Sequence, residues 1–382
     1  MIADREGRAV LGGGGTLEVD VKSIGRELRR LWDETGEAGA EGAANRPVIT
    51  RACTRNLIVL AANPEEAERA TGLLAAVAGM HPTRAFVVEA GAGGNPERLE
   101  AHLQAVCSIR GTGRHVCCEQ ITMSVGPGAR RRAAGTIVPL LVPDLPVFVW
   151  VLGEPDWDDE LLIRLLDVAD RLLVDTRRAA DPVAVMANLA RRPHKVRWTP
   201  GDFEWSRLSP WREAVASLFD EPATATLPAR LERVVVRFGA GGSAVGAALI
   251  AGWMVDRIAE ARERAATGRG RDAGGGAMGN AGAAATAVLE PVPDARAGEI
   301  CGIELHAREP AARCEVVAAA DDHALTARVT LAGSCALPVR QPWVRGAEES
   351  LLEDQLDTPG AWPTYEGALA IAASLLDGSA RG

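Results

Sequence analysis

The chain has 382 residues, 47% of them hydrophobic and 24% charged, which is the balance of a folded protein and excludes a disordered one. Its formal net charge of −9 argues against nucleic-acid binding, because phosphates repel an acidic chain that sets aside no basic patch. No apolar run is long enough to cross a bilayer, and the N-terminus lacks the apolar core of a signal peptide, so we expect a cytoplasmic protein with no membrane partner.

The length exceeds what one hydrophobic core usually supports, which predicts two domains. Ahead of them, residues 1–46 are predicted to hold a flexible tail, an amphipathic helix and a linker. Asp20 is a suitable N-cap for that helix. Apolar residues then recur on one helical face, at Ile24, Leu28, Leu31 and Trp32.

The N-terminal α/β domain is predicted over residues 47–156. LIVLA, from Leu57 to Ala61, is a short and fully apolar run, typical of a buried strand. A helix from Asn63 to Gly79 and a strand from Ala85 to Glu89 follow, and this order predicts a right-handed parallel crossover.

The rest of this domain contains a hairpin, a helix and a strand. Two alternating segments flank the glycine-rich turn 111–113 and predict antiparallel strands at His102–Ile109 and His115–Val125. We expect a helix near residues 129–140 and a buried strand at Pro146–Val151.

The C-terminal α/β domain is predicted over residues 157–382, again with a mostly parallel sheet flanked by helices, to which antiparallel strands are added. Strands are predicted at Arg171–Asp175, Leu231–Phe238 and near 286–290, 300–306, 313–318 and 325–331. Helices are predicted up to Ala169 and near 182–190, 210–219, 243–265, 347–356 and 362–377. A glycine-rich stretch at about 267–282 is predicted to be a disordered insertion.

One glycine-rich motif has the outline of a nucleotide site. Gly239-x-Gly241-x-x-Ala244 follows a predicted strand and opens a predicted helix, as a dinucleotide fingerprint does. It lies late in the chain, and the next strand does not end in a ribose-binding acid. We favour a structural interpretation, in which small residues let a helix pack close to its sheet, and keep an NAD(P)-binding enzyme as the alternative.

The cysteines are an odd set of seven, which argues against a disulfide framework. If Arg110 faces Arg114 across the hairpin turn, Cys107 lies opposite Cys117. Cys118 then points to the other face. Cys107 and Cys117 are a candidate redox pair, and the alternative is two buried thiols, since cysteine behaves as a small hydrophobe.

Motifs of common enzymes are missing from the sequence. It has no Gly-x-Ser-x-Gly elbow, no Gly-Lys-Ser/Thr phosphate loop and no HExxH metal motif. The acids at 156 and 158–160 could bind a cation, but a solvated acidic loop is the commoner case. We therefore expect a protein that is not an enzyme and needs no cofactor or metal.

The segment DFEWSRLSPWREAVASLFD, residues 202–220, gathers tryptophan and arginine in a chain poor in aromatic residues. Ser209 and Pro210 are suitable as N-cap and first residue of a helix. Its buried face is predicted to carry Trp211, Val215, Leu218 and Phe219. Trp205, Arg207 and Arg212 lie off that face, and for them surface recognition and a structural role both stay open.

Several blocks together resemble the glucose-6-phosphate dehydrogenase assembly proteins, the OpcA family. They are TRACTRNLIVLA (50–61), CCEQITMS (117–124), VPDLPVFVWVLGEPD (142–156), DRLLVDT (170–176), DFEWSRLSPWREA (202–214) and ALPVRQPWV (336–344). Cys118 stands where the family usually has serine, Val151 where it often has tryptophan, and the glycine-rich insertion is local to this chain.

The resemblance implies a non-catalytic partner of glucose-6-phosphate dehydrogenase. Such a protein favours the active oligomer of the enzyme, activates it allosterically and so raises flux into the oxidative pentose phosphate pathway. The contact needs a few well-desolvated anchors, for which arginine and tryptophan are suited. The candidate partner-binding residues are Arg51, Thr54, Arg55, Asn56, Glu119, Gln120, Trp205, Arg207 and Arg212. For Arg55 and Asn56 the alternative is a loop that satisfies backbone groups at the end of a strand.

Overall fold

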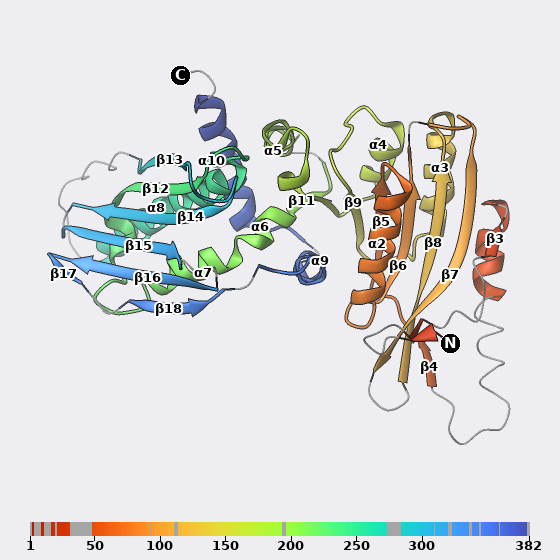
Figure 1. Ribbon diagram of the computed structural model, residues 1–382, viewed down its shortest axis with the longest axis horizontal. Helices are drawn as coiled ribbons and strands as arrows, with labels where there is room; N and C mark the ends of the chain where they lie inside the picture. The colour runs from red at the N-terminus through yellow and green to blue at the C-terminus, as the bar shows by residue number, and fades with distance from the viewer. Residues whose placement is uncertain are drawn as a thin grey trace. The chain divides into compact units, whose positions relative to one another are not determined.

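The computed structural model describes residues 2–3, 9–10, 17–19, 21–30, 48–91, 93–110, 114–192, 196–272, 284–308, 310–319, 323–335, 338–343, 345–358 and 360–379. The chain forms two compact units (Figure 1). Unit 1 consists of Met1–Asp175, Pro193–Phe203 and Ala347–Ala361. Unit 2 consists of Thr176–Arg192, Glu204–Gly346 and Trp362–Gly382.

Unit 1 contains a mixed, mostly parallel sheet. Its strand order is β11-β10-β9-β5-β6-β8-β7-β3, with β4 also paired to β8. The strands are β3 (Leu17–Val19), β4 (Val48–Arg51), β5 (Arg55–Ala61), β6 (Thr83–Glu89), β7 (Leu99–Arg110), β8 (Arg114–Val125), β9 (Val147–Val151), β10 (Arg171–Val174) and β11 (Thr199–Asp202). The pairs β7–β8 and β3–β7 are antiparallel and the others parallel, which confirms the α/β class and the predicted crossover.

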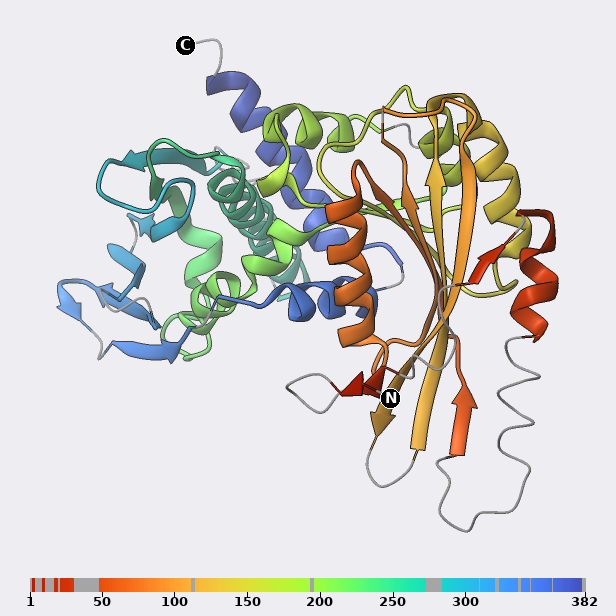
Figure 2. The same ribbon diagram turned by 45° about the vertical axis from the view of Figure 1, so that its right-hand side comes forward.

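Helices cover both faces of this sheet. Figure 2 shows α2 (Pro64–Val77) on one face and α3 (Arg130–Ile137) on the other. The N-terminus of α2 is capped: the Asn63 side chain accepts a hydrogen bond from the Glu66 N–H at 2.9 Å. Glu66 in turn accepts one from the Ala62 N–H at 2.8 Å. Each of these bonds satisfies a backbone donor that the first turn or its entry would leave without a partner.

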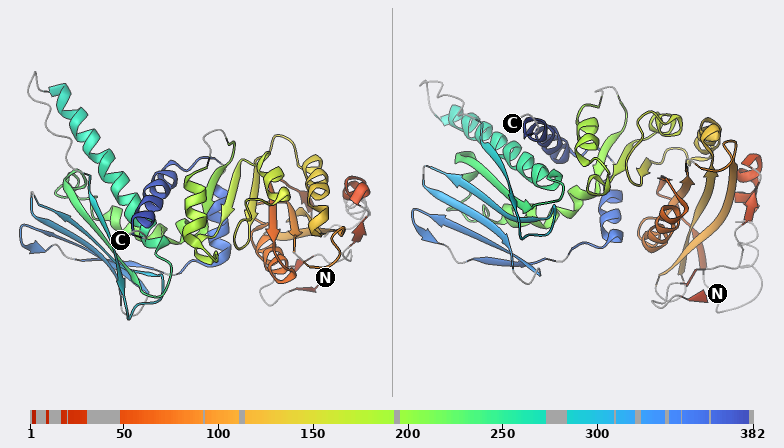
Figure 3. Two further views of the ribbon diagram at one scale, coloured as in Figure 1. Left: turned by 90° about the horizontal axis from the view of Figure 1, so that it is seen from above. Right: turned by 45° about the horizontal axis from the view of Figure 1, so that its top comes forward.

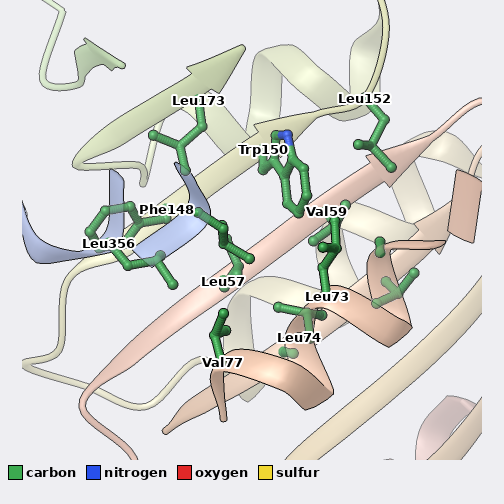
Figure 4. Close-up of a cluster of buried hydrophobic side chains, with 14 of the residues drawn as sticks. Leu57, Val59, Leu73, Leu74, Val77, Phe148, Trp150, Leu152, Leu173 and Leu356 are labelled. Atoms are coloured by element: carbon green, nitrogen blue, oxygen red, sulfur yellow. The ribbon is translucent and has the colours of Figure 1, made fainter. Parts of the chain in front are cut away.

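The core of unit 1 depends on a helix from the far end of the sequence. Figure 4 shows apolar side chains of β5, α2 and β9 packed together with Leu356 of α9 (Glu348–Asp357). Leu351 and Leu352 of the same helix are also buried in this cluster. Three leucines on one face of α9 therefore complete a core that begins about 300 residues earlier.

Polar bonds also hold α9 against unit 1. Arg55 donates a hydrogen bond to the Leu356 carbonyl, and Arg171 donates one to the Thr358 carbonyl. Gln355 is fully buried; it donates to the Asp202 carbonyl at 2.9 Å and accepts from Arg171 at 2.9 Å. The bonds to Leu356 and Thr358 satisfy carbonyls at the C-terminal end of α9, where a helix leaves such acceptors open.

Unit 2 contains a second sheet, of order β13-β12-β14-β15-β16-β17, with β18 paired to β16. Its strands are β12 (Leu231–Gly239), β13 (Thr286–Val292), β14 (Ile300–Ala307), β15 (Ala312–Ala318), β16 (Ala324–Leu331), β17 (Ser334–Cys335) and β18 (Val339–Pro342). β12 and β13 pair in parallel, and the other pairings are antiparallel. The prediction of a mostly parallel second sheet was therefore wrong, because the short connections after β14 allow only antiparallel neighbours.

Helices of unit 2 lie against this sheet or against one another (Figure 3). They are α5 (Pro182–Ala190), α6 (Phe203–Arg207, whose first residue is counted with unit 1), α7 (Ser209–Ser217), α8 (Val245–Asp272) and α10 (Pro363–Ser379). The helices α8 and α10 approach closely at Gly252, where an added Cβ would lie 2.4 Å from the Ala368 carbonyl oxygen. Only glycine fits there without moving a helix.

The division of the chain differs from the predicted boundary at residue 156. β10 pairs with β9 and extends the first sheet, so unit 1 continues to Asp175 and regains two later segments. Within the predicted tail, β1 (Ile2–Ala3) and β2 (Ala9–Val10) pair as antiparallel strands. Residues 24–30 are helical, with Ile24 and Leu28 buried as predicted.

Some predicted features lie outside the described residues. They are Asp20, Leu31, Trp32 and the linker before residue 48, and most of the glycine-rich insertion, since α8 is described as far as Asp272. Among the residues that the structure does describe, no helix has the length and apolar character of a membrane span.

Candidate functional site

The candidate residues in the second strand of the hairpin are structural. Glu119 is 5% exposed and accepts a hydrogen bond from Arg84 at 2.6 Å. Gln120 is 1% exposed and donates to Thr71 Oγ1 at 2.9 Å. Both bond within unit 1 and stabilise β8 against its neighbours, and their role toward a partner stays a prediction.

Around β5 the candidate residues differ from one another in exposure. Asn56 is fully buried, donates to the Val142 carbonyl at 3.0 Å and accepts from the Val142 N–H at 2.8 Å. These bonds are the ones that its structural alternative predicts. Arg55 is half-buried with its guanidinium on α9, and burial lowers its pKa. Thr54 stays exposed while it donates to the Pro82 carbonyl, and the side chain of Arg51 is outside the described residues.

The tryptophan and arginine segment builds the start of unit 2. Trp205 is completely buried, with ring centroids 5.5 Å from Tyr365 and 6.2 Å from Trp362. Arg212 lies over this indole, 3.7 Å from the ring centroid, and donates to the Trp205 carbonyl at 2.6 Å. Trp205 is therefore part of the core of unit 2, and its role toward a partner stays a prediction. Arg212 fixes the turn between α6 and α7.

The helix itself is placed as predicted, with one change at its start. Trp211, Val215 and Leu218 are buried, and Phe219 is half-buried. Leu208, not Ser209, is the N-cap residue, and Ser209 is the first helical residue. The hydroxyl of Ser209 accepts a hydrogen bond from Arg212 at 2.8 Å instead of capping the helix.

A pocket of about 390 Å³ opens beside this turn, entirely within unit 2. The residues that line it come from η4 (Thr176–Arg178), the α6–α7 turn, the start of β14 and the segment after β18. Its lining residues are Arg177, Arg178, Arg207, Leu208, Trp211, Glu299, Ile300, Trp343, Arg345 and Gly346. Of the predicted contact residues, Arg207 belongs to this lining.

The pocket has an apolar floor and a cationic rim. Leu208, Trp211, Ile300 and Trp343 are each less than 9% exposed, and the two indoles meet edge to face at 5.8 Å. The rim holds four arginines and one glutamate. Apolar floors with a few charged groups at the edge are typical of small-molecule sites.

The glutamates beside the pocket leave an excess of positive charge. Glu299 accepts from Arg345 at 2.7 Å and from Arg177 at 3.0 Å. Burial by itself would raise the pKa of Glu299, but these two hydrogen bonds outweigh it, and the pKa lies below the ordinary value. Glu204, 5% exposed, lies 3.3 Å from Arg207 and 4.0 Å from Arg177. Among the described lining residues and Glu204, the four arginines outnumber the two carboxylates.

The glycine-rich motif packs against the chain's own backbone. A Cβ on Gly239 would lie 1.8 Å from the Arg296 carbonyl oxygen, and one on Gly242 would lie 2.2 Å from the Gly298 nitrogen. The Gly298 N–H also bonds to the Gly239 carbonyl at 2.8 Å. The glycines thus let the β13–β14 connection approach, where we expected close approach of a helix to its sheet.

The hairpin register agrees with the prediction: Arg110 lies opposite Arg114, and Cys107 opposite Cys117. Cys117 is fully buried and disulfide-bonded. Cys118 points to the other face, its thiol near the Ala78 carbonyl, and burial raises its pKa to about 11. Cys118 is therefore a poor nucleophile at neutral pH.

The acidic stretch 156–160 has structural roles. Asp159 accepts from the Leu161 N–H at 2.8 Å at the start of α4 (Glu160–Leu166) and pairs with Arg130. Within the described ranges, no three His, Cys, Asp or Glu side chains gather as a metal site would need.

The fold and the pocket define a two-unit α/β protein with a cavity lined by arginines. Residues 74–191 match the family model of the glucose-6-phosphate dehydrogenase subunit N-terminal domain, and residues 200–369 match that of its C-terminal domain. Both models belong to OpcA, and the chain is a member of the OpcA family.

Curated relatives carry the same family name. Two proteins named "Putative OxPP cycle protein OpcA", from Synechocystis sp. and Nostoc punctiforme, are 32% and 30% identical over 165 and 168 residues. These segments are 42% and 43% of this chain but only 34% and 36% of the relatives, so the match spans about a third of their length. A solved structure, an oxidoreductase from Sinorhizobium meliloti, covers 86% of this chain and 90% of its own at 11% identity and a TM-score of 0.37, too low to carry an argument.

Sequence reasoning missed most of the pocket. Arg177, Arg178, Glu299, Trp343 and Arg345 come from separate segments, and only Trp343 fell in a block that the family resemblance had marked. No periodicity joins them, because their proximity comes from the packing of unit 2.

Proposed function

We propose that this protein is a non-catalytic assembly factor and allosteric activator of glucose-6-phosphate dehydrogenase. The observation that carries the proposal is the pair of family matches, over residues 74–191 and 200–369, whose models are described as subunit domains of that enzyme. An effector of this kind raises activity by binding the active oligomer more tightly than the inactive state.

We further propose that the partner contacts the exposed loop before β5 and the rim of the pocket. Thr54 is exposed, and we assign Arg51 to the same contact. Arg55 supports that loop through its bond to α9. Arg207 reaches the pocket rim with 17% of its side chain exposed, and Trp205 and Arg212 hold the turn that carries it. Arginine at a partly desolvated position is a common anchor of protein interfaces.

The direct test is to titrate the purified protein into the dehydrogenase of the same organism. The rate is recorded against glucose 6-phosphate, and the mass of the complex is measured by native mass spectrometry. We expect a lower Michaelis constant or a higher maximal rate, together with a heavier oligomer. An unchanged rate, Michaelis constant and oligomer mass would overturn the proposal.

A matched pair of variants tests the proposed contact. Arg207→Gln should weaken activation about tenfold in half-maximal concentration, because a charge-assisted hydrogen bond to the partner is lost. Arg308→Gln removes the same charge from an exposed position paired to Glu232 and should leave activation unchanged. Equal activation curves for the two variants would exclude Arg207 from the contact.

We also propose that Cys107 and Cys117 form a redox-sensitive pair. Support comes from their opposition in the hairpin and from the disulfide at Cys117. Because Cys117 is fully buried, exchange with a thiol requires local opening of the hairpin. Activation should therefore differ between protein reduced with dithiothreitol and oxidised protein, and Cys117→Ser should abolish the difference. Equal activation by both forms would refute a redox role.

A further inference from the structure

We propose that the pocket of unit 2 is a binding site for a small organic phosphate, a phosphate ester or anhydride carried on a ring. The site shares Arg207 with the proposed partner contact, but binding of the phosphate needs no partner, because the chain alone contains every group that it needs. The pocket combines a cavity of suitable size, concentrated positive charge and an apolar floor in one unit.

The charge of the pocket selects an anion. Arg177 and Arg345 present 37% and 38% of their side chains to solvent, and Arg178 is exposed. Guanidinium groups present a planar fork of N–H donors that matches the oxygens of a phosphate. Among the described lining residues four arginines stand beside one carboxylate, with Glu204 next to them, so the lining favours a ligand that carries negative charge.

One carboxylate orients the arginines that the ligand would meet. Glu299 bonds both Arg177 and Arg345, and these bonds hold its pKa below the ordinary value, so it stays ionised at neutral pH. A fixed anion between two arginines limits their rotamers before the ligand arrives. Such preorganisation lowers the entropy cost of binding.

The floor of the pocket selects for a ring. Trp211, Trp343, Leu208 and Ile300 present apolar surface, and Arg345 already lies 5.0 Å from the centroid of the Trp343 ring. A volume of about 390 Å³ is at the small end of the range for metabolite pockets. Inorganic phosphate alone would leave this floor in contact with water, whereas a sugar or base attached to the phosphate would cover it.

The test is isothermal titration calorimetry on the full chain without any partner, with ADP, inorganic pyrophosphate and adenosine as probes. We expect saturable binding of ADP, binding of pyrophosphate at least about fivefold weaker, and none of adenosine. ADP should also quench tryptophan fluorescence, and Trp343→Phe should reduce the quench. Absence of ADP binding up to millimolar concentrations would overturn the proposal, and so would equal affinity for ADP and pyrophosphate.

Charge variants locate the ligand. Arg178→Gln and Arg345→Gln should each weaken ADP binding about tenfold, as expected for loss of one charge-assisted hydrogen bond. Arg264→Gln is the control, since Arg264 lies on α8 with 76% of its side chain exposed, bonded to Glu260. Equal affinities of all three variants would overturn the site. Binding of a hexaglutamate peptide with no response to ADP would assign the pocket to a protein partner and also overturn it.

These outcomes are independent of the proposed activation. A chain that binds ADP but leaves the dehydrogenase unchanged would support the pocket and refute the activator. A chain that activates the enzyme but binds no ADP would do the reverse.

Discussion

Two regions of the molecule carry polar side chains in conspicuous sequence blocks. One is β8, with Glu119 and Gln120, and the other is the α6–α7 region, with Arg207 and Arg212. The side chains have different surroundings in the two regions. In unit 1, Glu119, Gln120 and Asn56 bond to neighbouring strands, helices and loops and leave no charged group at a cavity. In unit 2, Arg212 donates a hydrogen bond to the Trp205 carbonyl, whereas Arg207 lines a pocket with three other arginines.

The difference shows that a conspicuous block of polar residues is not by itself evidence of a contact with a partner, because such residues also stabilise the fold. A buried polar group must be hydrogen-bonded, so it is sensitive to substitution whether or not a partner exists. Exposure of a polar side chain at a cavity distinguishes a residue that is available to a ligand from one that only stabilises the fold. Substitutions in the two regions should therefore differ in what they change, stability or binding.

The largest effect should come from the core that α9 completes in unit 1. Leu352→Ala should lower the free energy of unfolding by about 3 kcal/mol, since it removes a fully buried leucine and leaves a cavity. Urea denaturation measures the loss. Ile163→Ala, at a position 46% exposed on α4, is the control and should cost less than about 1 kcal/mol. Similar losses for both variants would mean that α9 is peripheral to the core.

Next comes the buried amide of unit 1. Asn56→Ala should cost about 2 kcal/mol in urea denaturation, because the N–H of Val142 and the carbonyl of the same residue lose their partner. Asn95→Ala, which removes an exposed amide bonded to the Glu97 N–H, should cost less than about 1 kcal/mol. If Asn56→Ala instead kept full stability and lost activation of the dehydrogenase, Asn56 would be a contact after all.

A smaller loss is expected at the turn of unit 2. Arg212→Gln should cost about 1 kcal/mol, since the guanidinium loses its position over the Trp205 ring and a bond to the backbone. ADP affinity should stay within about twofold of the wild type, because Arg212 does not line the pocket. A tenfold loss of affinity without loss of stability would place Arg212 at the ligand.

The smallest effect concerns pH. Glu299 has a pKa lowered below 4.5 in the folded state, so its contribution to stability is fully present above the unfolded value. That contribution is lost as the pH falls through the folded pKa. The stability difference between the wild type and Glu299→Gln should therefore be constant near neutral pH and shrink below about pH 4.5. A difference that grows on acidification would contradict the proposed ion pairs with Arg177 and Arg345.

The sequence predicted individual elements better than their grouping. The periodic runs at β5, β6 and β12 and at α5, α8 and α10 all form near the expected residues. The grouping of β10 and α9 with unit 1 was missed, because an apolar strand or helical face indicates burial but does not name the surface that buries it. In the same way, the pattern around Trp205 marked an important segment but could not tell a buried ring from an exposed one.

By itself the sequence determined the α/β class, the positions of most strands and helices, the opposition of Cys107 and Cys117, and the family to which the chain belongs. These depend on local periodicity, turn chemistry and the order of motifs, all of which are properties of the amino-acid sequence. Tertiary structure alone decided that Asn56, Glu119, Gln120 and Trp205 are buried, that α9 closes unit 1, and that four arginines from three segments surround one cavity. Those outcomes depend on which distant surfaces meet, and packing settles them only when the whole chain has folded.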